Sequence, residues 1–221
     1  LITVRSRTTH CKIVKNCQTV VYFSFSPQPV MRNPLTHPSL FLAAFFGLIF
    51  ISAAPAQTHF WNHTNSGDWT DALMWTPNTV PNGATDWANI SVSSATPYTV
   101  TLNTNILLDQ LELLASGATL SAIGRDVTVN TLTDTGTGTT MLLRATNWLG
   151  AGTFRIGSGG TLEALGTSSV ENLEQNGVMR VIGNGTGGHA NLTLLGDATN
   201  SGTFQLKSEG STYSQTVLMS G

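Results

Sequence analysis

Apolar and polar residues alternate in three short segments of the last third of the chain. In each segment, two apolar residues with one polar residue between them closely follow a glycine. A period of two predicts a β-strand with one face in the core and the other toward solvent. The glycines and apolar residues are Gly152, Phe154 and Ile156, then Gly177, Met179 and Val181, then Gly202, Phe204 and Leu206.

The three glycines recur with a constant 25-residue period. A fixed period of this length is typical of a solenoid, in which each coil buries its apolar face against its neighbours. We therefore predict an all-β solenoid whose strands stack about 4.8 Å apart. The same period would place Arg155 beside Arg180, so we expect a slight register offset that separates the two charges.

A second repeated sequence pattern has a different spacing. The pattern Ser-Gly-x-Thr-Leu-x-Ala occurs at residues 116–122 and again at 158–164, a 42-residue offset that is not a multiple of 25. We therefore expect coils of variable length, about 20–25 residues, over residues 90–221. Gly221 falls partway through a coil of this frame, so we expect the chain to be truncated at its C-terminus.

Residues 57–89 differ from the coils because they hold four of the five tryptophans. Large aromatic side chains suit a cap that closes the first coil, where no earlier coil covers the core. The alternative is a carbohydrate-binding module, because exposed aromatic faces stack on sugar rings. The four residues are Trp61, Trp69, Trp75 and Trp87.

Residues 31–56 have the order of a secretory signal peptide. Met31 and Arg32 form a positively charged N-terminal region, and residues 39–51 form an apolar run. Residues 52–56 are mostly small residues, as expected before a cleavage site. About 12 apolar residues are too few for the roughly 20 that span a bilayer. We expect Sec-type export with cleavage between Ala56 and Gln57. Residues 1–30 precede this start, and we interpret them as translation from upstream of the true start or as a long leader.

Charge and cysteine content narrow the function of the exported part. Residues 57–221 carry five basic and twelve acidic residues, and both cysteines lie before them. An acidic excess offers no basic surface for nucleic acid or anionic lipid. We therefore expect no nucleic-acid partner, no thiol chemistry and no cofactor.

Candidate chemistry is sparse. His59 and His63 are four positions apart, but the surrounding sequence does not predict the helix that would bring them together on a metal. We expect the acidic residues after the cap not to cluster on one face of the coils, whereas glycan-cleaving sites need clustered carboxylates. We predict a non-catalytic chain. The alternative is the N-terminal scaffold of a β-helix polysaccharide lyase or hydrolase.

Residues 67–75 read Gly-Asp-Trp-Thr-Asp-Ala-Leu-Met-Trp, and residues 80–86 read Val-Pro-Asn-Gly-Ala-Thr-Asp. With the coils that follow, roughly residues 59–221, they resemble bacterial exported proteins with autotransporter-associated β-strand repeats. Met74 stands where that family usually has Asn. The resemblance implies a right-handed parallel β-helix that is secreted or surface-displayed, as an adhesin passenger or a stalk.

The resemblance also implies partners. We expect a monomer that contacts a surface glycan or the extracellular matrix. We expect membrane attachment only through a missing C-terminal anchor.

Overall fold

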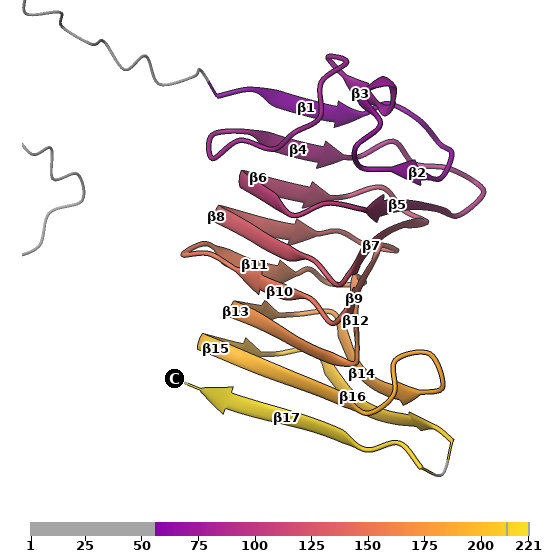
Figure 1. Cartoon of the computed structure of the whole chain (residues 1–221), viewed down its shortest axis with the longest axis vertical. Helices are drawn as coiled ribbons and strands as arrows, with labels where there is room; N and C mark the ends of the chain where they lie inside the picture. The colour runs from indigo at the N-terminus through magenta and orange to yellow at the C-terminus, as the bar shows by residue number, and fades with distance from the viewer. Residues whose placement is uncertain (1–55, 211, 221) are drawn as a thin grey trace, which may run out of the picture. The chain divides into compact units, whose positions relative to one another are not determined.

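Two ladders of parallel strands run along residues 56–210 and 212–220, which are the residues that the structure describes (Figure 1). The structure is a computed structural model. The ladders form a parallel β-solenoid of about six turns, which confirms the predicted fold class. Residues 1–30 and nearly all of the predicted signal peptide lie outside the described residues.

One ladder is a ten-stranded sheet, here sheet A, and the other is a seven-stranded sheet, here sheet B. Sheet A contains β1 (Thr58–Trp61), β3 (Trp75–Thr76), β4 (Trp87–Ile90), β6 (Ile106–Leu113), β8 (Asp126–Thr135), β10 (Asn147–Leu149), β11 (Thr153–Ile156), β13 (Thr167–Gln175), β15 (Ala190–Asn200) and β17 (Gln215–Ser220). Sheet B contains β2 (Gly67–Asp68), β5 (Tyr98–Leu102), β7 (Ala118–Ile123), β9 (Thr140–Arg144), β12 (Thr161–Leu165), β14 (Val178–Asn184) and β16 (Thr203–Glu209).

Among the described residues the only helix is the short 3-10 helix η1 (Ala72–Met74). No helix in this part of the chain has the length and apolar character needed to cross a membrane. All named strand pairs are parallel except β1 with β3, which is antiparallel.

Over most of the stack the coils are shorter than the 25-residue spacing of the three glycines, but they lie within the predicted range of about 20–25 residues. Thr119, Thr140 and Thr161 are direct Cα partners in sheet B, which gives a 21-residue coil. The 42-residue offset between the two Ser-Gly-x-Thr-Leu-x-Ala segments is therefore the length of two such coils. Coils lengthen toward the C-terminus, where Ala190 of β15 pairs with Gln215 of β17 and the coil reaches the predicted 25-residue length. The expectation of variable coil length is confirmed.

The predicted equivalence of the three Gly-containing segments is only partly correct. Met179 pairs with Phe204 and Val181 with Leu206, so the second and third segments are neighbours in sheet B. Phe154 instead lies in sheet A and pairs with Leu173. The 25-residue spacing from Gly152 to Gly177 thus leads from one sheet to the other, and it is not a coil length.

The alternation within the segments is confirmed for the first two. Phe154, Ile156, Met179 and Val181 are all at most 3% exposed and belong to the core. In the third segment Phe204 is 38% exposed and Leu206 is 55% exposed. β16 is the last strand of sheet B among the described residues, so no further described strand covers this pair.

Turn positions repeat with the period of the coils. Gly117, Gly138 and Gly159 all have positive φ, which glycine adopts without the steric cost of a Cβ. Their backbones form a ladder, because Gly117 N donates to Gly138 O and Gly138 N donates to Gly159 O. These glycines mark the corner at which three successive coils pass from sheet A to sheet B.

Candidate functional site

Three tryptophans form a buried cluster near the N-terminal end of the solenoid. Trp61, Trp69 and Trp75 have no exposed surface. Trp61 and Trp75 meet edge-to-face with ring centroids 5.2 Å apart, and Trp69 and Trp75 do so at 4.7 Å. Edge-to-face contacts of this kind stabilise a core beyond the area that they bury. The cluster fits the predicted aromatic cap.

The cap also closes the edge of sheet A. β3 is a very short strand that lies at the end of the sheet and is followed directly by Pro77. A short edge strand that ends in proline resists pairing with another chain. The indole of Trp75 donates to Trp69 O at 2.9 Å, and the indole of Trp69 donates to Pro81 O at 3.0 Å.

Three of the four tryptophans are too deeply buried for the alternative in which they stack on sugar rings as a carbohydrate-binding module. A side chain with no exposed surface has no face to offer a sugar ring, and Trp61, Trp69 and Trp75 are in this state. Trp87 differs because it is only half-buried. On β4 it lies on the opposite face from Ala88 and Ile90, which belong to the core.

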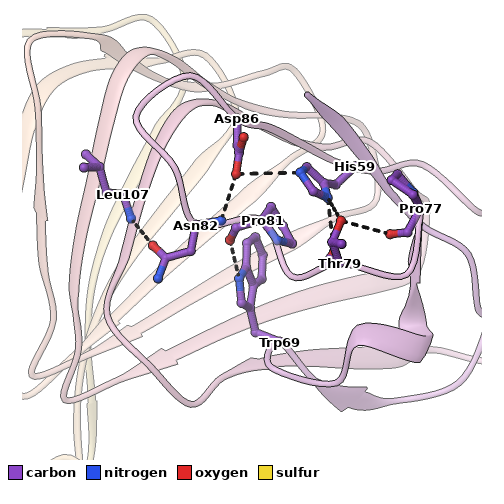
Figure 2. A network of polar contacts seen from close by, with 8 residues as sticks. All are labelled: His59, Trp69, Pro77, Thr79, Pro81, Asn82, Asp86 and Leu107. Carbon is purple, nitrogen blue, oxygen red and sulfur yellow. Dashed lines mark hydrogen bonds and ion pairs between the residues drawn. The ribbon is translucent and has the colours of Figure 1, made fainter. Parts of the chain in front are cut away.

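A polar network fixes the loop between β3 and β4 (Figure 2). His59 is 2% exposed; its Nδ1 lies 3.1 Å from Thr79 O, and its Nε2 lies 3.6 Å from a carboxylate oxygen of Asp86. That same oxygen accepts a hydrogen bond from the backbone N–H of Asn82. The side-chain oxygen of Asn82 in turn accepts from Leu107 N at 2.8 Å. The network therefore ties the loop to β1 and to β6.

The two histidines of the sequence pattern have separate partners. His59 is buried in the network, whereas His63 is partly exposed and its Nε2 lies 3.2 Å from Leu73 O. Within residues 56–210 and 212–220, no three His, Cys, Asp or Glu side chains are grouped to hold a metal ion.

Sheet A carries a second arrangement on its outer face. A row of outward residues, one from each successive strand, runs along the stack and is called the polar column below. Neighbours in the row are direct Cα partners. The polar column consists of Thr76, Phe60, Asn89, Glu112, Asp134, Arg155, Glu174 and Thr199.

Each charged side chain of the polar column has a hydrogen-bond partner among its neighbours. Arg155 donates from Nε to one oxygen of Asp134 at 3.0 Å and from Nη2 to the other at 2.6 Å. This hydrogen-bonded carboxylate raises the pKa of Arg155. Asn89 donates to Glu112 at 2.6 Å, and Asn176 donates to Glu174 at 2.9 Å.

Two predictions about charge are therefore wrong. Arg155 and Arg180 are separated because they lie in different sheets, and not by the expected register offset. Arg155 is in sheet A between Asp134 and Glu174, while Arg180 is in sheet B and bonds Glu163 at 3.0 Å. The acidic residues also share a position of the repeat, because Glu112, Asp134 and Glu174 lie in one column. A 21- or 22-residue frame would have revealed Glu112, Asp134 and Arg155, whereas the 25-residue frame separated them.

An open hollow of about 410 Å³ lies at the far end of the polar column. Its lining includes Glu174 and Thr199 of the column, together with Thr153, Asn172 and Asp197. A second hollow of about 350 Å³ lies near the cap between residues 64–66 and 94–98. Hydroxyl and amide groups line both hollows, and carboxylates line only the first.

Nothing among the protein-family models, the curated proteins or the solved structures matches the chain.

Proposed function

We propose that the chain is a non-catalytic scaffold from an exported bacterial β-solenoid, acting as a surface stalk or as the passenger of an adhesin. The observation that carries this proposal is the continuous parallel solenoid with its buried tryptophan cap. Such a fold builds an extended surface from repeated coils and suits display more than the enclosure of a substrate. The signal-peptide pattern of residues 31–56 and the family resemblance of residues 59–221 point to export.

The hydrogen bonding of the polar column supports a structural role for its charges. Each of its carboxylates accepts a hydrogen bond from a neighbouring side chain: Asp134 from Arg155, Glu112 from Asn89, and Glu174 from Asn176. In this arrangement the carboxylates are held by hydrogen bonds within the solenoid itself.

Export is tested by expressing the full chain with a C-terminal epitope in a Gram-negative bacterium, beside a version that lacks residues 31–56. We expect the first protein in the periplasm or beyond, with Gln57 at its N-terminus by mass spectrometry. The second should remain in the cytoplasm. Cytoplasmic retention of the first protein with an intact leader would contradict the proposal.

A further inference from the structure

We propose that the outer face of sheet A, along the polar column, binds a linear uncharged polysaccharide. This inference goes beyond the scaffold function and does not depend on it, because binding is measured on the purified chain wherever that chain is located in the cell.

Aromatic side chains lie at the cap end of this face. Phe60 is 47% exposed on β1, and Trp87 is half-buried on the adjacent strand β4. Their strands pair with Thr58 opposite Trp87 and Phe60 opposite Asn89, so both aromatic side chains project to the outer face. An exposed aromatic ring offers an apolar face for the C–H groups of a sugar ring.

Unpaired polar groups lie next to these rings. Asn89 is only 7% exposed, and neither its side-chain oxygen nor the indole N–H of Trp87 has a hydrogen-bond partner among the described residues. A buried donor and acceptor without partners are unusual in native proteins. A sugar hydroxyl group can accept from the indole N–H or donate to the amide oxygen once the side chains that cover these buried atoms move aside. A sugar also has an apolar ring face for the exposed ring of Phe60.

The column extends this site in one direction. Glu112, Asp134, Arg155 and Glu174 follow Asn89 on successive strands, about 4.8 Å apart, toward the 410 Å³ hollow. Each carboxylate keeps acceptor sites, and the guanidinium keeps N–H donors, beyond the hydrogen bonds that they make to their neighbours, and these can bond to sugar hydroxyl groups. A row of such groups on successive coils fits a chain of sugars that lies along the solenoid axis.

Charge decides the class of polysaccharide. The column has three carboxylates against the single Arg155, and Asp197 in the hollow adds a fourth. Repulsion disfavours polyanions such as uronic-acid polymers on this face. The face therefore fits neutral chains.

The experiment measures retention of the purified full chain on insoluble cellulose and insoluble chitin, and its retardation in gels that contain xylan or polygalacturonate. We expect binding to at least one of the three neutral polymers and none to polygalacturonate. Phe60→Ala should weaken that binding about tenfold. The matched control is Leu73→Ala, which removes another exposed apolar side chain of the cap, 71% exposed, that is not part of the column. Circular dichroism melting curves verify that both variants fold.

Three results would overturn the proposal: no retention on any neutral polymer, equal retardation by polygalacturonate, or equal loss of binding in the two folded variants. Release of reducing ends from a bound polymer would leave the binding face supported, and it would contradict the non-catalytic scaffold. The two proposals can therefore fail separately.

Discussion

Glycine has a second role in this solenoid besides forming turns. A Cβ added to Gly177 would overlap the carbonyl oxygen of Gly160, and one added to Gly202 would overlap that of Gly177. Neither Gly177 nor Gly202 has positive φ, so the restriction is close approach between coils and not backbone conformation. At these two positions the backbone of the neighbouring coil therefore leaves no room for a side chain.

We predict that Gly177→Ala lowers the free energy of unfolding by about 1–3 kcal/mol or more, because backbone atoms must move to admit the methyl group. The control is Gly185→Ala, since the nearest atom to a Cβ there is the Tyr213 hydroxyl at 3.6 Å. Urea unfolding followed by circular dichroism should show Gly185→Ala within about 0.5 kcal/mol of the original chain. Equal losses in the two variants would contradict close approach as the cause.

Charge pairing at Arg155 gives a second prediction at this scale. Its guanidinium is bidentate on Asp134, with the two side chains 40% and 18% exposed. Because solvent screens a pair exposed to this degree, we expect a coupling energy of only about 0.5–1 kcal/mol. A double-mutant cycle of Arg155→Met and Asp134→Asn measures it, and the value should shrink in roughly 1 M salt.

The control for this cycle is the pair of Lys207 and Glu209, whose side chains are 56% and 45% exposed. We expect no measurable coupling there. A coupling at Arg155 that is no larger than at Lys207 would mean that the bidentate geometry does not stabilise the fold.

At the scale of strands, the sequence correctly predicted alternation but not always the partner of each strand. Phe154-Arg155-Ile156 and Met179-Arg180-Val181 have the same pattern, yet the first lies in sheet A and the second in sheet B. Apolar-polar-apolar alternation requires only one buried face, so it cannot distinguish two sheets around one core. Turn positions are more informative, because Gly117, Gly138 and Gly159 need a left-handed backbone at the same corner of three successive coils.

The sequence likewise predicted only part of the candidate site. The clustering of tryptophans near the N-terminal end followed from composition and burial preference. The polar column did not, because it depends on a 21- to 22-residue register that the 25-residue frame concealed. Phe60 gave no signal, since the tryptophan-rich segment around it has no clear strand period.

Phe154 and Phe204 test the corrected register. Phe154 is 1% exposed and meets Trp148 edge-to-face at 5.1 Å, whereas Phe204 is 38% exposed on the last described strand of sheet B. We predict that Phe154→Ala costs about 3–5 kcal/mol of unfolding free energy. Phe204→Ala should cost clearly less than half of that. Equal costs, measured by urea unfolding, would show that the two residues are buried alike.

At the scale of the whole solenoid, stability depends on contacts between neighbouring coils. Each coil in such a protein contacts only the coils beside it, so its stability is a sum of local terms and interface terms. Among the described residues the first coil has a neighbouring coil on one side only, so we expect its stability to depend on the cap. Here Trp61, Trp69 and Trp75 supply that cap, and the loop network of His59, Asp86 and Asn82 holds it against β6.

We therefore predict that Trp75→Ala loosens the N-terminal coils first. Removing a buried tryptophan costs about 3–5 kcal/mol, but coils far from the cap keep both of their interfaces. Hydrogen exchange read by mass spectrometry should show lost protection in β1, β4 and β5, with β12 and β14 changed little. Leu73→Ala, an exposed change in the same cap, should leave the pattern intact. Uniform loss of protection along all coils would instead mean that the solenoid unfolds as a single cooperative unit, with the cap one part of a shared core.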